Sequence, residues 1–437
     1  MRRPAIRLPP ALGWEGEWAS RSRSGTPFLW RAVAAVLVFG CAPPRPQPPA
    51  LGPEPELRVG LLVGASGVRL GGDGELFVTD DANGRPVGAV KAGTAWTVVP
   101  DTSGGLVLVR PDGTRTERHS GISAVNVTEG RFAMANGRRY RGRVNIVRDR
   151  TGVTLINRVS LESYLAGVLA QEMGPRRAEE REALLAQAVV ARTFALRNRG
   201  RWEVQGFDAT ADTRDQVYLG AEAESPQVWE AIRATAGEVV RYQGRLIEAF
   251  YHAACGGRTA AVEEVFRSAQ RQPYLRSIAD RSRDGRAYCE RAPRFSWREE
   301  WEATTLRTIL TRTLTAVMTV SGDGLQPITD LQVTRSTAAG RVAQLRIVFS
   351  HGDVRIDGPD VRTVLRPTPD RLLWSSAFRL FVTKDGPLVS RLVAEGAGAG
   401  HGVGFCQWGA IGRARAGQRY RDILGTYFPG TTVGRLY

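Results

Sequence analysis

The hydrophobic pattern of the chain changes its period at Ser160, and this change constrains the fold more than any other feature. From Leu57 to Arg158, short runs alternate apolar and polar residues and are separated by turns such as GGDG and RPDG. This pattern predicts a small N-terminal β domain at residues 57–158. After Ser160 apolar residues recur at helical spacing. We therefore predict an α+β protein in which a mixed α/β region, residues 159–437, follows the β domain.

Two helices are predicted at the start of this region. Ser160 can cap the first helix, and Gly174 followed by proline can end it. The second helix covers about residues 179–198 and is nearly all apolar in its central part. Such a helix is buried on most sides, so its polar residues Gln187 and Arg192 either hold the core together or line a cleft.

Two further segments complete residues 159–437. A mixed β insertion is expected at about residues 297–395, where GRVAQLRIVFS and PLVSRLVAEG are the clearest strands. Near the C-terminus, the glycine-rich stretch GHGVGFCQWG predicts a loop that leads into a short helix.

Residues 1–41 have the features of a signal peptide. Several arginines precede an apolar run at residues 32–40, which is too short to span a bilayer as a mature helix. The sequence VFG before Cys41 resembles a bacterial lipobox, so we expect acylation of Cys41 and a membrane-anchored, exported protein. A plain secretory signal, or a start codon assigned too early, is the alternative. The proline-rich residues 42–56 are expected to form an extended linker.

The strong positive charge does not indicate a nucleic-acid partner. The net charge is +16, but among 60 basic residues only Lys91 and Lys384 are lysines, and the arginines are spread along the chain. We find no basic stripe interleaved with aromatic residues, no zinc-finger spacing and no basic helix. An anionic polymer or a lipid headgroup surface would be attracted by the same charge.

Glu172 is the first candidate for catalysis. It falls on the apolar stripe of the first predicted helix, which consists of Leu161, Tyr164, Leu165, Val168, Leu169 and Met173. Burial and the negative end of the helix dipole both favour a protonated carboxyl group, which is the form that a general acid needs. The alternative is a structural glutamate that pairs with Arg192 or bonds to the helix end.

The loop GHGVGFCQWG is the second candidate. Glycines around His401 let the backbone approach a ligand closely, while Gln407 and Trp408 offer an amide and a flat apolar face suited to a sugar ring. The glycine spacing does not match a dinucleotide-binding motif. A nucleophilic pair of His401 and Cys406 is disfavoured, because no third orienting group is evident.

The segment HAACGG contains His252 and Cys255, and Cys289 follows downstream. In an exported protein Cys255 and Cys289 most simply form a disulfide, which is the interpretation we favour. The alternative is a structural zinc held by His252 and the two cysteines, with Cys406 or another histidine as the fourth ligand. No other cofactor is expected.

Several ordered motifs resemble the stage II sporulation protein D (SpoIID) domain family, which also includes the amidase enhancers. They are VSLESYLAGVLAQEM, ALLAQAVVARTFAL, DTRDQVYLG, FYHAACGGRT, GPDVR and GHGVGFCQWGAIGRARAGQRYRDILGTYFPGT. The similarity extends in order from Leu57 to Tyr437. It implies that residues 159–437 form a SpoIID-type catalytic domain.

The resemblance implies a peptidoglycan lytic transglycosylase that acts on glycan strands, in sporulating members on strands stripped of stem peptides. The catalytic glutamate of the family motif corresponds to Glu172, although Gln171 stands where serine or alanine is usual. Substrate-bordering positions of the family correspond to five residues: Gln187, Arg192, His401, Gln407 and Trp408. The role in sporulation does not transfer with the motifs.

In the implied reaction Glu172 protonates the glycosidic oxygen and then accepts the proton of the muramic C6 hydroxyl, giving a 1,6-anhydro product. One carboxyl group serves both steps. Asp208, Asp212 and Asp215 could supply a second acid, or they are turn and strand-capping residues.

Two other functions compete with this one. The first is a non-catalytic peptidoglycan binder that stimulates a partner amidase, as the amidase enhancers do. The second is a metal-dependent wall hydrolase that uses His252 and the cysteines.

Overall fold

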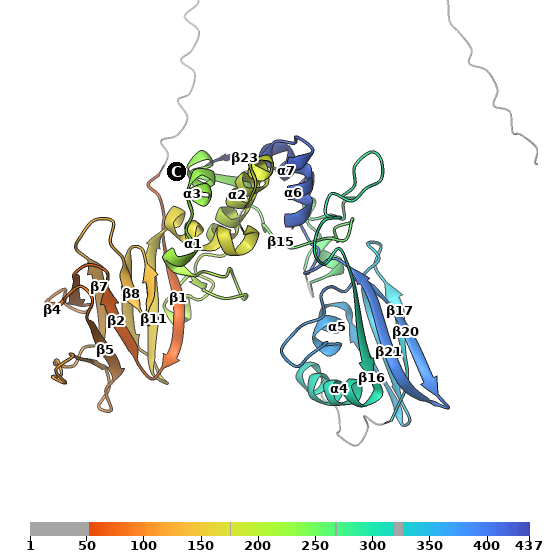
Figure 1. Ribbon diagram of the computed structural model, residues 1–437, viewed down its shortest axis with the longest axis horizontal. Helices are drawn as coiled ribbons and strands as arrows, with labels where there is room; N and C mark the ends of the chain where they lie inside the picture. Colours follow the sequence, from red (N-terminus) through yellow and green to blue (C-terminus); the bar gives the residue numbers. More distant parts are fainter. Residues whose placement is uncertain (1–51, 175, 267–268, 319–326) are drawn as a thin grey trace, which may run out of the picture. The chain divides into compact units, whose positions relative to one another are not determined.

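The computed structural model describes residues 52–437 except 175, 267–268 and 319–326 (Figure 1). Residues 51–437 make one compact unit. The predicted signal peptide, Cys41 and most of the proline-rich linker lie outside the described residues. Among the helices that are described, none is both long and apolar enough to cross a membrane.

The first part of the chain is the predicted β domain (Figure 1). Its two sheets have the strand orders β12-β1-β11-β10-β7-β3-β4 and β6-β5-β2-β8-β9, and apolar residues of both sheets belong to one core. The strands from the β domain are β1 (Glu56–Ala65), β2 (Val68–Gly72), β3 (Leu76–Asp80), β4 (Pro86–Val90), β5 (Ala95–Pro100), β6 (Leu106–Val109), β7 (Gly121–Asn126), β8 (Ala133–Ala135), β9 (Arg138–Tyr140), β10 (Arg143–Arg148) and β11 (Val153–Ser160). Strand β12 (Ala209–Thr210) comes from the later region and pairs with β1.

Strand β11 leads directly into helix α1 (Leu161–Met173), so the change of period at Ser160 is the junction between sheet and helix. Ser160 does not cap this helix: its hydroxyl contacts the hydroxyl of Ser163 at 3.1 Å. Instead, Glu54 Oε1 accepts the hydrogen bond of the Glu162 N–H at 2.7 Å. The predicted cap is therefore wrong, because a residue that precedes β1 supplies the acceptor.

Helix α2 (Arg181–Arg197) follows the 3₁₀ turn η1 (Ala178–Glu180) and lies among the other helices of this region. It packs against α1, α3 (Pro226–Ala234), α6 (Gln407–Arg415) and α7 (Tyr420–Tyr427). Most of its side chains are buried, as its apolar sequence predicts. Two small sheets complete the region: β14 (Arg245–Leu246), β13 (Glu238–Tyr242) and β23 (Thr432–Arg435) form one, and β15 (Tyr251–His252) and β22 (Phe405–Cys406) form the other. Three further 3₁₀ turns are η2 (Glu203–Gln205), η3 (Gly220–Ala223) and η4 (Val262–Glu264).

The segment from Ser296 to Ala397 has a hydrophobic core of its own, which includes Trp301, Leu345 and Leu392. We call this segment the inserted module. It covers the part of the chain where a β insertion is expected, and its first and last strands pair so that Ser296 lies opposite Ala397. Its elements are β16 (Ser296–Glu302), α4 (Ala303–Val317), β17 (Ile328–Ser336), β18 (Val342–Phe349), β19 (Gly352–Asp357), α5 (Gly358–Val364), β20 (Phe378–Asp385) and β21 (Leu388–Ala397).

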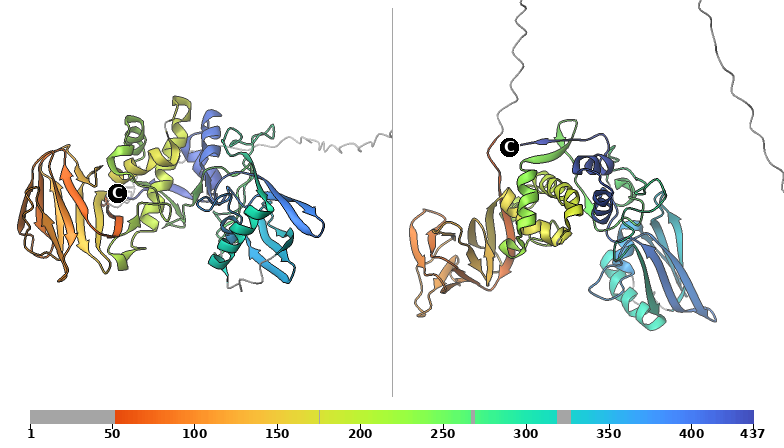
Figure 2. Two further views of the ribbon diagram at one scale, coloured as in Figure 1. Left: turned by 60° about the horizontal axis from the view of Figure 1, so that its bottom comes forward. Right: turned by 45° about the horizontal axis from the view of Figure 1, so that its top comes forward.

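The arrangement is visible in Figure 2, where the inserted module forms a separate layered part of the ribbon. Its sheets have the strand orders β16-β21-β20 and β17-β18-β19. The observed architecture confirms the predicted α+β class, with a β domain followed by a mixed region.

Candidate active site

The two-stranded parallel sheet of β15 and β22 brings two distant segments together. Tyr251 pairs with Phe405, and His252 pairs with Cys406. Gln407 begins α6 directly after β22. Consequently Tyr251 and Gln407 are neighbours in space although the sequence separates them widely.

Both residues contact Glu172 in the last turn of α1. The Tyr251 hydroxyl donates to Glu172 Oε1 at 2.8 Å, and the Gln407 amide Nε2 donates to Oε2 at 3.2 Å. Burial raises the pKa of Glu172, and the two hydrogen bonds partly offset this rise because they stabilise the carboxylate. The result is a half-buried acid whose proton is held more tightly than that of an exposed glutamate.

A chain of neutral polar groups extends behind this acid. Tyr164 donates its hydroxyl proton to Gln216 Oε1, and Gln216 Nε2 donates to the Tyr251 hydroxyl, both at 3.2 Å. Gln187 Oε1 accepts from Gln407 Nε2 at 3.5 Å. The predicted site residues Glu172, Gln187 and Gln407 are thus brought together.

Sequence reasoning missed Tyr251 and Gln216 as site residues. Each lies inside a motif that carries the family resemblance, FYHAACGGRT and DTRDQVYLG. Those motifs were the available signal, but strand alternation by itself does not tell which residue of a short strand faces Glu172.

Arg192 lies elsewhere, and its proposed contact with substrate must be corrected. Its side chain is fully buried, and it donates to Glu162 through Nε at 3.0 Å and Nη2 at 2.6 Å. Its Nη1 donates to the Glu238 carbonyl at 3.0 Å. Pairing between Glu172 and Arg192 is likewise contradicted, because the Arg192 guanidinium group forms its ion pair with Glu162.

His401 and Trp408 have different surroundings from each other. The His401 Nδ1 accepts from the Val403 N–H at 3.0 Å, and burial lowers its pKa to about 4, so the ring is neutral near pH 7. Trp408 is half-buried, and the guanidinium carbon of Arg176 lies 5.8 Å from the centre of its ring system. Contact of either residue with substrate stays a prediction.

The three aspartates proposed as a possible second acid have structural partners. Asp208 accepts from Arg58, Asp212 accepts from Arg214, and Asp215 accepts from the Trp202 indole. Arg214 lowers the pKa of Asp212 to about 2. The described contacts therefore fit turn and strand-capping roles rather than a second catalytic acid.

The cysteines do not form the expected disulfide. Cys255, Cys289 and Cys406 are buried free thiols, and the Sγ atoms of Cys255 and Cys289 are 3.5 Å apart. His252 is not part of this group: its Nδ1–H donates to the Val403 carbonyl at 3.1 Å. Asp280 takes its place, since one ligand atom from each of the three cysteines and Asp280 lies within 4.8 Å of the others.

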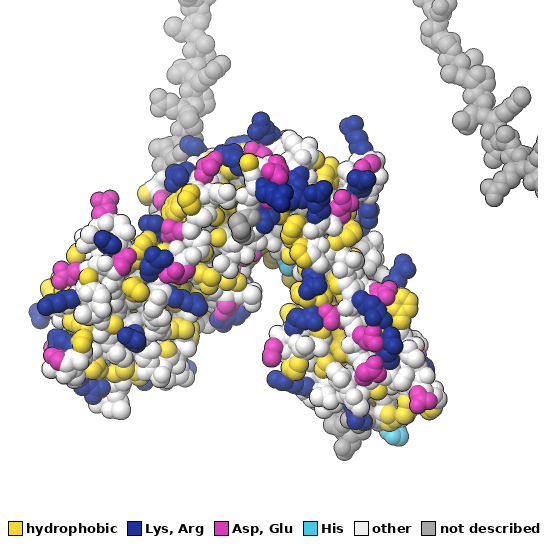
Figure 3. Space-filling view, in the orientation of Figure 1, with side chains coloured by type: hydrophobic (Ala, Val, Ile, Leu, Met, Phe, Trp, Pro, Cys, Tyr) yellow, Lys and Arg dark blue, Asp and Glu magenta, His cyan; other side chains and the backbone are white. Residues whose placement is uncertain are grey.

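A cavity of about 960 Å³ lies beside this cysteine group, away from the described contacts of Glu172. Trp297 and four arginines, Arg258, Arg281, Arg298 and Arg379, are among its lining residues. On the face shown in Figure 3, basic side chains are spread over the surface and interspersed with acidic ones, and no continuous basic stripe is seen.

Two parts of the chain match models of known protein families. Residues 149–242, which include Glu172, Gln187 and Gln216, match a family model described as stage II sporulation protein. Residues 284–404 match a domain of unknown function, DUF8618, and this match covers the inserted module.

Three relatives illustrate the similarity. An uncharacterised protein of Brachyspira hyodysenteriae is 31% identical over 302 residues, which are 68% of this chain and 73% of that protein. The amidase enhancer of Bacillus subtilis is 29% identical over 62% of this chain but only 40% of its own length. Stage II sporulation protein D of Bacillus subtilis is 26% identical over 65% of this chain and 77% of that protein.

Proposed function

The chain belongs to the SpoIID family of stage II sporulation proteins, and from this premise we propose that it remodels the bacterial cell wall as an exported peptidoglycan lytic transglycosylase. The substrate would be the glycosidic bond between N-acetylmuramic acid and N-acetylglucosamine. Acylation of Cys41 would hold the enzyme at the membrane.

The observation that carries this proposal is the environment of Glu172. Burial favours its neutral form, which can donate a proton. Tyr251 and Gln407 donate to the same carboxyl group, so they stabilise the carboxylate that remains after the proton has left. A group that must first give a proton and then take one back needs both forms to be accessible.

The reaction then follows with a single carboxyl group. Glu172 gives its proton to the glycosidic oxygen, and the bond from this oxygen to C1 of the muramic residue breaks as an oxocarbenium-like state develops. The Glu172 carboxylate next accepts the proton of the C6 hydroxyl while that oxygen bonds to C1. No water is consumed, and the product carries a 1,6-anhydro ring.

A second candidate is a non-catalytic peptidoglycan binder that stimulates an N-acetylmuramoyl-L-alanine amidase. The similarity to the amidase enhancer favours it, although the aligned part is only 40% of that protein. In this case the polar groups around Glu172 would bind glycan without cleaving it.

The two candidates differ in their products. We would incubate residues 51–437 with peptidoglycan before and after an amidase has removed the stem peptides, and identify products by mass spectrometry. The unaltered protein would be compared with Glu172→Gln and with the control Glu179→Gln, whose side chain is 54% exposed.

The transglycosylase is supported if 1,6-anhydro products form with the unaltered protein and the control but are at least about 100-fold reduced in Glu172→Gln, the usual minimum effect of losing a general acid. Glycan binding without any 1,6-anhydro product, together with stimulation of an added amidase, would establish the binder instead.

A further inference from the structure

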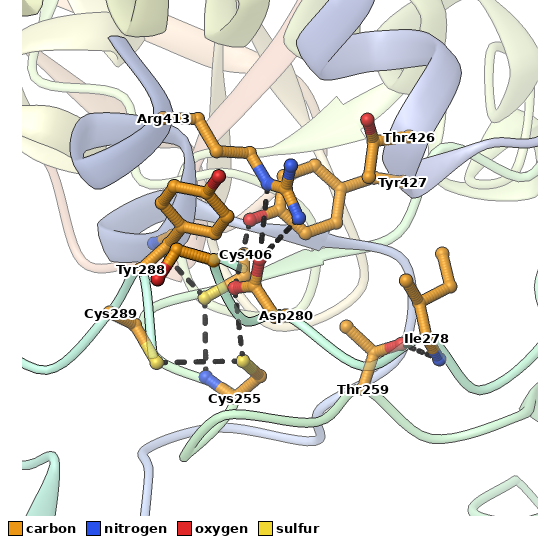
Figure 4. Close-up of polar contacts among 12 residues, drawn as sticks. Cys255, Thr259, Ile278, Asp280, Tyr288, Cys289, Cys406, Arg413, Thr426 and Tyr427 are labelled. Atoms are coloured by element: carbon orange, nitrogen blue, oxygen red, sulfur yellow. Dashed lines mark hydrogen bonds and ion pairs between the residues drawn. The ribbon is translucent and has the colours of Figure 1, made fainter. Parts of the chain in front are cut away.

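Three thiols and one carboxylate converge on one buried point (Figure 4). The Sγ atoms of Cys255 and Cys289 are 3.5 Å apart, and Asp280 Oδ2 is 3.3 Å from Cys255 Sγ. Thiolates at the corners of a tetrahedron around Zn²⁺ are about 3.8 Å apart, given a Zn–S distance of about 2.3 Å. We infer that Cys255, Cys289, Cys406 and Asp280 bind one Zn²⁺ as a closed structural site.

Backbone groups around the sulfurs are arranged to stabilise thiolates. The N–H groups of Cys255 and Gly409 both donate to Cys406 Sγ at 3.2 Å, and the Gly257 N–H donates to Cys255 Sγ at 3.3 Å. Hydrogen bonds to an ionised acceptor are stronger than those to a neutral one. Metal binding requires deprotonated cysteines, so these donors favour the ligating form.

Asp280 is held in place as ligating carboxylates usually are. Its Oδ1 accepts from Arg413 Nε at 3.1 Å and Nη2 at 2.9 Å, and its Oδ2 accepts from the Tyr427 hydroxyl at 2.9 Å. These contacts leave Oδ2 directed at the cysteine sulfurs (Figure 4).

Buried positive charge balances the proposed ligand set. Three thiolates and a carboxylate carry two more negative charges than Zn²⁺ neutralises, and Arg413 supplies one positive charge beside them. Arg341 can supply the second: its side chain is 1% exposed, and none of its guanidinium nitrogens has a hydrogen-bond partner among the described residues. Burial lowers the pKa of Arg341, whereas negative charge on Cys255, Glu264 and Cys406 raises it.

The proposed zinc would support the candidate active site without touching it. Cys255 lies four residues after Tyr251, and Cys406 directly precedes Gln407. Tyr251 and Gln407 donate the described hydrogen bonds to Glu172. A metal that joins Cys255 to Cys406 would fix the spacing of β15 and β22, and with it the position of both donors.

The test uses residues 51–437, which contain only the three buried cysteines. We expect native mass spectrometry and elemental analysis to find about one zinc per chain, and Co²⁺ substitution to give the visible absorption of thiolate coordination. After chelation and denaturation without reductant, three thiols should react with an alkylating agent. Absence of bound metal after growth with zinc, or alkylation of only one thiol, would overturn the inference.

Variants identify the ligands. Cys406→Ser and Asp280→Asn should lower zinc affinity at least about tenfold, as loss of a supporting contact alone usually does. The control Asp284→Asn, whose side chain is 62% exposed, should retain full occupancy. Equal occupancy in Asp280→Asn and the control would exclude Asp280 as a ligand.

If these variants fail to fold, chelation of the unaltered protein still tests the role of the zinc. Removal of zinc should increase hydrogen exchange in β15 and β22, and re-addition should reverse it. An unchanged exchange rate would refute the supporting role. None of these measurements uses wall-cleaving activity, so zinc binding and the proposed transglycosylase can fail independently.

Discussion

The surroundings of Glu172 shift the pKa of its carboxyl group in opposite directions. Burial raises its pKa, while the hydroxyl of Tyr251 and the amide of Gln407 lower it. An acid that reacts in its protonated form loses activity as the pH rises through its pKa. The alkaline limb of the pH–rate profile should therefore report the balance of these effects.

Tyr251→Phe tests this balance. Removing the hydroxyl takes away one donor to the carboxylate, so the pKa of Glu172 should rise further and the alkaline limb of kcat/KM should move up by about one pH unit, because a hydrogen bond to a charged group contributes about 1.5 kcal/mol. The control is Tyr274→Phe, whose hydroxyl accepts only from the Glu248 N–H among its described contacts. A limb that stays in place or moves to lower pH would contradict this role for Tyr251.

Helices α1 and α2 are joined by a buried ion pair rather than by apolar contact alone. Arg192 of α2 is 0% exposed at its side chain and Glu162 of α1 is 12% exposed. Glu162 Oε1 also accepts from the Gly237 N–H at 3.0 Å and from the Tyr437 hydroxyl at 2.5 Å. The pair therefore connects both helices to the start of β13 and to the C-terminal residue.

Arg192→Met should act on stability and not on chemistry. Breaking a buried pair leaves an uncompensated charge, so we expect the free energy of unfolding to fall by about 3 kcal/mol, measured by denaturant titration. Activity of the folded fraction should be unchanged. Arg197→Met on the same helix is the matched control, because its pair with Glu248 is partly exposed and should contribute less than about 1 kcal/mol. A raised KM in a fully folded Arg192→Met protein would restore Arg192 as a substrate-binding residue.

The described chain contains two hydrophobic cores. One spans the β domain and the helices that position Glu172, and the other lies in the inserted module. Separate cores allow separate local unfolding, because one core can open without exposing the apolar residues of the other. The match of residues 284–404 to a domain model of their own agrees with this division.

Trp301→Ala tests the independence of the inserted module. Trp301 is 1% exposed, and its indole N–H donates to the Arg366 carbonyl at 2.8 Å, so its loss should destabilise the module by about 3–5 kcal/mol. Hydrogen exchange should increase within residues 296–397 but not in α1 and α2. Phe381→Ala, at a position 51% exposed, should change little. A uniform increase over the whole chain would show that the two cores unfold together.

The sequence by itself predicted the type of the elements on either side of Ser160 and the position of Glu172, but it did not predict helices α4 and α5 within the expected β insertion. Alternation before Ser160 and helical spacing after it predict the β domain, α1 and α2, because side-chain burial follows the period of the backbone. The same spacing places Glu172 on an apolar face, where its carboxyl group must lose hydration.

Only the tertiary structure decided which groups meet. Glu172 contacts Tyr251 and Gln407, which are 79 and 235 positions away, whereas Arg192, an equally plausible partner in sequence, is bound by Glu162. Likewise, only the tertiary structure places Asp280 beside the three cysteines, because its spacing in the sequence does not indicate a ligand. Periodicity reports which face of an element is buried, but the partner on that face is set by how the elements pack, and this information is not local in sequence.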